Sequence, residues 1–549
     1  MEPHNHQFDF DFIVIGSGFG GSVSALRLAE KGYRVAVIEM GRRWTPESFP
    51  RTSWSIHRWF WRPKLGLHGF FNMRFFRHAT IFHGCAVGGG SITYAATLLA
   101  PPEKVWEISS WTGLADWKAE MPSHYQTASR MLGVTRNTIL GPADRLLQKT
   151  GETAGSGNTF YSTRVGIFQP TGEPANKTFA DPFFGGEGPS RTTCTGCGGC
   201  MMGCRYGAKN TLDLNYLYLA EKHGAEIFPE TKVVDVKPLH AASNGNCGYE
   251  VCTVKSTALI RRAPRALTCR GVVFSASSLG TMELLFRLRE KGSLPAISAR
   301  LGKHVRTNSE SIIGARIPAC ADDLSQGIAI GSGIYIDEHT HIEAVRYPSG
   351  SDTMGFLTTF LTDGRPGAGR IGLWLKNSMW LLLRHPFKTL RVIRPWGWAR
   401  EATILLCMQA LEGHIEMQWQ RPWFWPFSKT LVSRGDKVPT YIPRANEFAK
   451  IFAQVAGGTA MSMLPEILFD IPGTAHCIGG CVIADSPQRG VVDDHHRVFG
   501  YRNMYICDGS VLAANLGVNP SLTITALAER AMSFIPTAME TAWNDAAGS

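Results

Sequence analysis

The sequence lacks several features that define whole classes of protein. It contains no run of about 18 uninterrupted apolar residues, so no membrane-spanning helix is expected. Its first residues lack a basic segment followed by an apolar one, the pattern of an export signal. With 44% hydrophobic and 18% charged residues, the composition excludes disordered and fibrous proteins. We therefore expect a globular cytoplasmic protein, long enough at 549 residues for more than one domain.

A disulfide framework is not indicated either. The chain has 13 cysteines, an odd number without an export signal, which favours reduced thiols or metal ligands. Cys194, Cys197, Cys200 and Cys204 have the spacing CxxCxxCxxxC, which is the bacterial ferredoxin spacing without its usual following proline. An iron–sulfur cluster is the favoured prediction. Structural zinc or another metal, and buried thiols without a ligand, remain open.

The clearest pattern in the chain is a strand, glycine turn, helix and strand between Phe8 and Gly41. This order predicts a dinucleotide-binding βαβ unit, in which glycines permit a tight turn, a close approach to a pyrophosphate and close helix packing. An acid about 20 residues after the first glycine can accept a hydrogen bond from a ribose hydroxyl. The predicted cofactor-binding residues of this unit are Gly16, Gly18, Phe19, Gly20, Gly21 and Glu39.

Three later segments fit around such a cofactor. Glycines precede a hydroxyl residue in the stretch from Phe82 to Ala95, which indicates backbone pressed against a flat or anionic group. A glycine-rich crossing between domains remains the alternative there. His476 lies in the stretch TAHCIGGCVIADS, and Asn519 stands before Pro520 at the start of a predicted helix. A polar amide in that position can face a ligand at the mouth of the helix.

Acidic residues are missing from two stretches that are rich in aromatic and basic residues. One lies between Glu47 and Glu103, and the other between Asp363 and Glu401. The net charge is +11, and aromatic rings beside cations suit an anionic membrane surface. Peripheral association with the inner face of the membrane is one prediction, and a core of aromatic side chains with a basic rim is the other. Nucleic acid is bound by the same residue types, but we do not expect it beside a nucleotide-cofactor motif.

The chain resembles the glucose–methanol–choline (GMC) family of FAD oxidoreductases, and most closely its cholesterol oxidase branch. The resemblance rests on VIGSGFGGSVSALRLAEKGYRVAVIEMGRRW near the start, GCAVGGGSITYA, and YICDGSVLAANLGVNPSLTITALAERA near the end. It implies an α/β fold, with a doubly wound, Rossmann-like FAD-binding domain built from discontinuous segments and an inserted α+β substrate-binding domain. The predicted FAD-binding segments are residues 8–50, 80–100, 187–300 and 466–540, with the cysteines of 194–204 among them. The predicted substrate-binding segments are residues 51–79, 101–186 and 301–465.

The resemblance also implies roles for individual residues. His476 matches the active-site histidine that orients the alcohol and assists proton removal, and Asn519 matches the asparagine that hydrogen-bonds substrate or flavin. Glu343 matches the glutamate that moves a proton during double-bond isomerisation in steroid oxidases, although a surface glutamate is an equal alternative. The implied FAD contacts are Gly16, Gly18, Gly21 and Glu39 on the ADP half, Gly84, Gly88, Gly89, Gly90 and Ser91 along the pyrophosphate, the Val233 backbone at the adenine, and Asp508, Gly509, Asn519, Pro520 and Ser521 near the isoalloxazine.

The implied reaction is the FAD-dependent oxidation of the hydroxyl of a bulky lipophilic alcohol, a sterol or long-chain alcohol, to a carbonyl. The cysteine run favours a dehydrogenase that passes electrons to a carrier or quinone, and O₂ is the other acceptor considered. Two further classes remain open because the fold also hosts non-redox chemistry. One is a flavin lyase or decarboxylase acting on a lipid, and the other is a non-catalytic electron-transfer or lipid-binding subunit.

Overall fold

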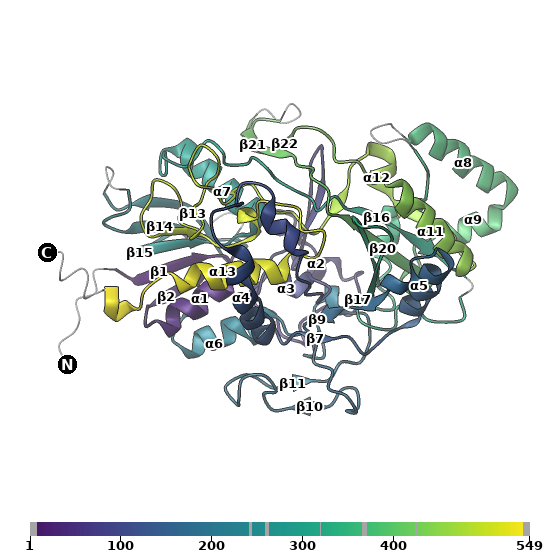
Figure 1. Ribbon diagram of the computed structural model, residues 1–549, viewed down its shortest axis with the longest axis horizontal. Helices are drawn as coiled ribbons and strands as arrows, with labels where there is room; N and C mark the ends of the chain where they lie inside the picture. Colours follow the sequence, from purple (N-terminus) through teal and green to yellow (C-terminus); the bar gives the residue numbers. More distant parts are fainter. Residues whose placement is uncertain are drawn as a thin grey trace.

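The computed structural model describes residues 8–240, 244–258, 263–318, 320–364, 370–422 and 427–541. Two large sheets with their covering helices make up the molecule (Figure 1). None of the helices in these ranges combines the length and apolar content that crossing a bilayer requires.

The first sheet contains the predicted nucleotide-binding unit. Its strands are β12 (Glu226–Phe228), β2 (Val35–Ile38), β1 (Phe10–Ile15), β15 (Arg265–Phe274), β14 (Tyr249–Lys255) and β13 (Thr231–Pro238) in that order, with β25 (Met504–Ile506) also paired to β15. The neighbours β12, β2, β1, β15 and β25 pair in parallel. Strand β1 is almost entirely apolar because helices cover both faces of a parallel sheet. The predicted α/β class with a Rossmann-like sheet is confirmed.

Helices α1 (Phe19–Glu30), α6 (Tyr216–Lys222) and α13 (Ser521–Ser533) lie on one side of this sheet, and α7 (Ser277–Lys291) lies on the other (Figure 1). On the outer side of α13 packs α4 (Trp117–Met131). Helix α1 begins at Phe19, so Gly20 and Gly21 of the predicted glycine turn are already helical. Both are tightly packed, because a Cβ on Gly20 would lie 1.7 Å from the carbonyl oxygen of Cys507 and one on Gly21 2.0 Å from that of Gly16.

The second sheet is antiparallel. Its order is β19 (Thr358–Phe360), β23 (Thr459–Met463), β16 (Ser311–Arg316), β20 (Ala402–Gln409), β18 (Thr340–Val345), β17 (Ile330–Tyr335) and β8 (Tyr161–Ser162). One face packs against α5 (Pro142–Thr153) and α11 (Pro443–Val455) around Phe448 and Phe452. Because side chains alternate along a strand, Ile404 and Leu406 of β20 point to the opposite face.

A small three-stranded sheet lies beside the two large ones. Strand β6 (Thr80–Gly84) pairs with β5 (Phe71–Phe75) and with β24 (Gly473–Thr474). His476 follows β24 by two residues, and the glycine-rich stretch begins at the end of β6. The small sheet therefore brings these two sequence-predicted segments together.

The two acid-poor stretches differ in how far their aromatic residues are buried. In the first, Trp59, Trp61, Phe70 and Phe71 are buried and belong largely to one aromatic core, so the prediction of a membrane-facing surface is wrong for these residues. Aromatic rings of this size bury a large apolar area when they pack on one another. The second stretch forms α8 (Ile371–Arg384) and α9 (Pro386–Ile393), which stand out at one end of the molecule (Figure 1).

Candidate active site

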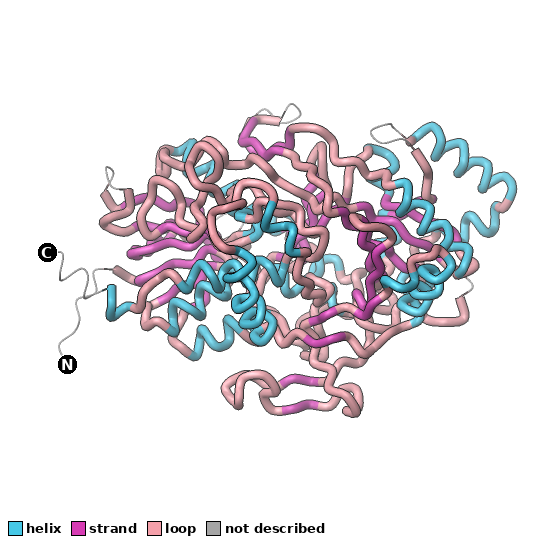
Figure 2. Tube along the Cα trace, in the orientation of Figure 1, coloured by secondary structure: helices cyan, strands magenta, loops and turns pink. Residues whose placement is uncertain are grey.

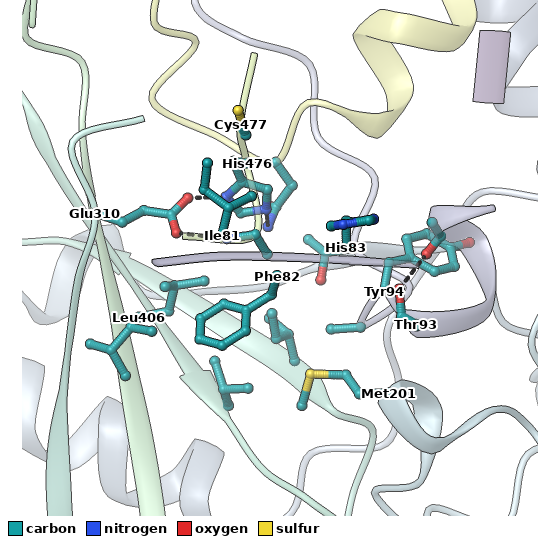
Figure 3. A pocket seen from close by; sticks show the side chains of 18 of the residues that line it. Ile81, Phe82, His83, Thr93, Tyr94, Met201, Glu310, Leu406, His476 and Cys477 are labelled. Carbon is teal, nitrogen blue, oxygen red and sulfur yellow. Dashed lines mark hydrogen bonds and ion pairs between the residues drawn. The ribbon is translucent and has the colours of Figure 1, made fainter. Parts of the chain in front are cut away.

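An apolar cavity of about 300 Å³ lies between the two large sheets. Most of its lining is aliphatic or aromatic. Among its polar groups, Glu310 and His476 lie at one side, and His83, Thr93 and Tyr94 lie at another (Figure 3). A cavity of this volume with a mainly apolar lining is typical of a small-molecule site and favours a lipophilic ligand.

His476 is held by a carboxylate that the sequence analysis missed. Its Nδ1 is hydrogen-bonded to Oε1 of Glu310, which immediately precedes β16 (Figure 3). The other carboxylate oxygen of Glu310 accepts a hydrogen bond from the backbone N–H of Ala475 at 3.3 Å. Because a carboxylate can only accept, this contact places a proton on Nδ1 of the imidazole and leaves Nε2 free to accept another.

Asn519 connects the histidine to a second buried carboxylate. Its Nδ2 donates to Oε2 of Glu343 at 3.2 Å and lies 3.5 Å from Nε2 of His476. Glu343 lies on β18 opposite Leu406, which lines the cavity, and it is fully buried. Of the two alternatives for Glu343, the surface position is therefore wrong. The three predicted catalytic residues lie together, 43 to 176 residues apart in the chain.

The segment before β16 supports both sides of this group. Asn308 donates from Nδ2 to the carbonyl of Val518 at 3.0 Å and accepts from the N–H of Gly517 at 2.9 Å. Asn308 and Ser309 have positive φ values of 58° and 47°, a strained conformation for residues other than glycine. This backbone brings Glu310 to the histidine while Asn308 holds the loop that carries Asn519. The only sequence signal for this role is an acid directly before a buried strand.

The carboxylates set the electrostatics of the site. Burial lowers the pKa of His476, but the charge of Glu310, the hydrogen bond to it and the charge of Glu343 outweigh burial, so the pKa is raised overall. Burial raises the pKa of Glu343 to about 7 against the hydrogen bond from Asn519. Its Oε1 and the Oδ1 of Asn519 have no hydrogen-bond partner among the residues that the structure describes. A carboxyl group that titrates near neutral pH and keeps free hydrogen-bonding capacity, as Glu343 does, suits proton transfer.

A cleft of about 1140 Å³ adjoins the cavity at the first sheet. The predicted cofactor residues that line the cleft are Gly16, Gly18, Glu39, Gly84, Gly89, Gly90 and Val233. Those that line the cavity are Gly18, Phe19, Gly20, Gly84, Gly90, Asp508, Gly509, Asn519, Pro520 and Ser521. Neither space is lined by Gly21, Gly88 or Ser91. The shared residues make cleft and cavity continuous. One elongated molecule can therefore reach from Glu39 to His476.

The glycine turn has the shape of a cradle for a phosphate group. Gly16 has φ +103°, and a Cβ there would lie 2.2 Å from the carbonyl oxygen of Ser275. Gly18 differs, because a Cβ on it would meet no protein atom within 4 Å. The open space at Gly18 lies at the N-terminus of α1, where unpaired N–H groups favour an anion. The residues present therefore fit the pyrophosphate of FAD.

Glu39 and Asp508 lie near the two ends of this path. The carboxylate of Glu39 accepts hydrogen bonds from Ser17 and from the N–H of Gly41 at 2.8 Å, while burial raises its pKa. Asp508 accepts from the N–H of Ser510 at 2.9 Å and from the hydroxyl of Thr281 at 2.6 Å. These contacts fix both carboxylates beside the cleft or cavity. Their predicted contacts with the cofactor stay predictions.

The structure does not support the predicted metal centre at the cysteines. Among the described residues, no group of three or more His, Cys, Asp or Glu side chains is arranged to hold a metal ion. Two of the thiols accept backbone hydrogen bonds instead, Cys194 from Gly196 and Cys204 from Lys209, each at 3.4 Å. Burial raises the pKa of the Cys200 thiol to about 12, which favours a neutral thiol over a thiolate ligand.

The cysteine segment has a structural role instead, and it lies within a region that is mostly loop (Figure 2). Gly198 donates to the carbonyl of Gly327, and Gly327 donates to that of Gly196, each at 2.7 Å. The buried ammonium of Lys209 donates to the carbonyls of Ile92, Tyr94 and Cys200. The segment thus joins the glycine-rich stretch to the loop between β16 and β17 of the second sheet, and the spacing of its cysteines could not indicate these partners.

Comparisons with known proteins agree with one another. A family profile described as GMC oxidoreductase matches residues 453–528, and one described as NAD(P)-binding Rossmann-like domain matches residues 14–83. The chain is 58% identical over 532 residues to a cholesterol oxidase of Acinetobacter baumannii, covering 97% of this chain and 95% of that protein. It is 45% identical over 541 residues to a cholesterol oxidase of Mycobacterium tuberculosis, covering 97% and 92%. The crystal structure of pyridoxine 4-oxidase from Mesorbium loti has a TM-score of 0.61 at 14% identity, covering 95% of this chain and 99% of that one, and supports the fold alone.

The substitution Gly18→Ala tests the cradle without disturbing the fold. Gly18 has φ −72° and free space around its Cβ position, so we expect the free energy of unfolding of the apoprotein to change by no more than about 0.5 kcal/mol. The methyl group would occupy the space that a pyrophosphate needs, and FAD affinity should fall at least about tenfold. Flavin fluorescence titration measures the FAD affinity. Gly372→Ala, which also has free space, is the matched control, and wild-type FAD affinity in Gly18→Ala would contradict the assignment.

Proposed function

The chain belongs to the GMC oxidoreductase family, as its motifs predicted, and from that premise we propose that it oxidises the hydroxyl group of a sterol to a ketone with FAD as hydride acceptor. The observation that carries the proposal is the buried group of His476, Asn519 and two carboxylates beside a mainly apolar cavity. A sterol has the matching distribution of one hydroxyl on a large apolar body. Both full-length relatives are cholesterol oxidases, which supports a sterol over a long-chain alcohol.

FAD, when bound, supplies the acceptor for the hydride that leaves the alcohol carbon. We assign its pyrophosphate to the turn at Gly16 and Gly18, its ribose to Glu39 and its adenine to the backbone at Val233. The end of the path at Asp508 to Ser521 is assigned to the isoalloxazine because Asp508, Gly509, Asn519, Pro520 and Ser521 all line the cavity beside His476. Each assignment rests on the continuous space from Glu39 to His476.

His476 acts as the general base. Glu310 accepts a hydrogen bond from Nδ1–H and fixes the ring, so Nε2 faces Asn519 and can take the proton of the substrate hydroxyl. The imidazolium that forms lies between two carboxylates, which lower the free energy of the charged state. The amide of Asn519 hydrogen-bonds the hydroxyl oxygen and sets the direction of its O–H bond toward Nε2.

Glu343 moves a proton in a second step. After oxidation, a sterol with a neighbouring double bond carries an acidic C–H between the carbonyl and that double bond. The carboxylate takes this proton and returns it to the far end of the double bond, which shifts into conjugation without net change in atoms or electrons. A pKa near 7 allows Glu343 to accept and donate a proton at neutral pH.

O₂ is the electron acceptor in this proposal. A dehydrogenase was favoured by the predicted iron–sulfur cluster, and that argument fails because the cysteines are not arranged to hold a metal. Both full-length relatives are oxidases. The two electrons and two protons of the alcohol then reduce O₂ to hydrogen peroxide.

Removing the base or the orienting amide tests the reaction. His476→Ala and Asn519→Ala should each lower kcat/KM for sterol oxidation by about 10²–10⁴-fold, while FAD stays bound because the glycine turn assigned to the pyrophosphate is intact in both variants. Peroxide formation and flavin absorbance measure the two quantities. His240→Ala, at an exposed histidine, is the control. Wild-type kcat/KM in both active-site variants would rule out this site.

The substitution Glu310→Gln tests how the histidine is tuned. Loss of the negative charge lowers the pKa of His476, so the imidazole stays unprotonated to lower pH and the acid limb of the kcat/KM profile moves to lower pH. The plateau should fall about tenfold or more, because the ring loses its fixed tautomer. Glu310→Asp keeps the charge and should keep the limb near its original pH. If the acid limb of the Glu310→Gln profile stays at the wild-type pH, Glu310 has only a structural role. The control is Glu338→Gln, at an exposed glutamate.

Isomerisation is separable from oxidation. Glu343→Gln keeps the shape of the side chain but removes its ability to carry a proton, so we expect oxidation within about tenfold of wild type and a product whose double bond has not shifted. Ultraviolet absorbance of the conjugated enone distinguishes the two products. If Glu343→Gln still gives the conjugated ketone at the wild-type rate, another group moves the proton.

A further inference from the structure

Four methionines line the cavity in which the proposed reaction forms hydrogen peroxide. They are Met201, Met354, Met461 and Met463. A thioether needs no deprotonation before a peroxide oxidises it, whereas a thiol reacts as its thiolate. The thiol of Cys477 also lines the cavity, but burial raises its pKa to about 12. The methionine sulfurs are therefore the groups of this lining that are most open to oxidation.

The sulfur of Met463 lies against the segment that carries the histidine. A Cβ on Gly473 would lie 2.6 Å from Sδ of Met463 and 3.3 Å from its Cε. Gly473 belongs to β24 and precedes His476 by three residues. The Cδ1 of Ile312, two residues after Glu310, would lie 3.0 Å from the same Cβ. The thioether of Met463 thus packs where the backbones that carry His476 and Glu310 come together.

Met463 is shielded from bulk solvent but open to the cavity. Its side chain is 3% exposed and belongs to the aromatic core that contains Phe71, Phe82 and Trp398. Because it lines the cavity, a molecule formed there meets it without first crossing solvent. One molecule confined to about 300 Å³ has an effective concentration on the order of 5 M, far above that of peroxide in the surrounding solution. Peroxide formed in the cavity therefore reaches Met463 far more effectively than peroxide from outside.

We propose that Met463 is a modification site, oxidised to methionine sulfoxide by the hydrogen peroxide that the reaction itself produces. A lone pair of the thioether attacks one oxygen of the peroxide, so that an S–O bond forms while the O–O bond breaks. The other oxygen leaves as water. The sulfur loses two electrons and the peroxide gains them, which balances the step without a further oxidant. This inference rests on the proposed function, because that function supplies the peroxide.

A sulfoxide does not fit the present packing of Met463. The modification replaces an apolar side chain by a polar one that carries an additional oxygen. The contact with Gly473 leaves no room even for a methyl group on that side of the sulfur. The surrounding cluster is apolar, and burying a polar group there is costly. Oxidation of Met463 therefore displaces β24 and with it His476, and activity falls as the sulfoxide accumulates.

Peptide mapping by mass spectrometry compares three methionines of the FAD-loaded protein in one sample. Met463 is buried and lines the cavity, Met282 is buried but lines neither cavity nor cleft, and Met539 is 85% exposed. Excess catalase removes peroxide from the bulk solution during sterol oxidation. Under these conditions we expect at least about tenfold more sulfoxide at Met463 than at Met282 or Met539. Hydrogen peroxide added without sterol should instead oxidise Met539 first, and Met463 no more than Met282.

Loss of activity during turnover gives a second measurement, in which each variant is compared with its own initial rate. Met463→Leu keeps an apolar side chain of similar volume and should lose activity at least about threefold more slowly than wild type. Met539→Leu is the matched control and should lose activity as fast as wild type does.

Two results would overturn the proposal. One is equal sulfoxide at Met463 and Met282 while ketone accumulates, and the other is an unchanged loss of activity in Met463→Leu. Failure of the proposed function gives a different result, namely neither ketone formation nor O₂ uptake when sterol is added. In that case no peroxide forms, and the proposed modification of Met463 fails together with the function.

Discussion

The hydrogen bond between Glu310 and His476 joins the two parts of the molecule on which the site depends. The carboxylate comes from the start of a strand in the antiparallel sheet, and the imidazole comes from a loop beside the nucleotide-binding sheet, 166 residues away. Asn519 and Glu343 form a second link between the same two parts. Burying two carboxylates is costly unless they are hydrogen-bonded. Their partners therefore fix both the relative position of the two sheets and the protonation of the histidine.

Local patterns were enough to predict the strand, glycine turn and helix of the first sheet and the helix start at Pro520, whereas the contacts of these residues with a cofactor stay predictions. The glycines at 16 to 21, Glu39 and the Asn519–Pro520 step each owe their form to a short-range requirement, a turn, a close approach or a helix start, and such requirements are written in neighbouring residues. Glu310 was missed because its importance comes from a partner far away in the chain. The prediction of an iron–sulfur cluster at the cysteines was wrong because it used only their spacing. Hydrogen bonds to Gly327 and Lys209, which lie outside that spacing, fix the segment in another arrangement. Burial of the aromatics near Trp59 likewise depends on long-range packing.

The lining of the site comes from both halves of the molecule. The glycine turn and the cleft beside it lie on the side of the first sheet, whereas Met461 and Trp398 line the cavity on the side of the second sheet. In the proposed function the nucleotide is therefore held by the first sheet, and the apolar body of the alcohol lies against the second.

The central claim is that this site oxidises a sterol hydroxyl with bound FAD. Anaerobic titration of the FAD-loaded protein with a 3-hydroxysterol, followed by flavin absorbance and product analysis, tests it most directly. The account predicts loss of the oxidised flavin spectrum with one ketone formed per flavin, and recovery of the spectrum when O₂ is admitted. Flavin that no sterol or long-chain alcohol reduces would contradict it and would favour a non-redox flavin lyase or an electron-transfer subunit.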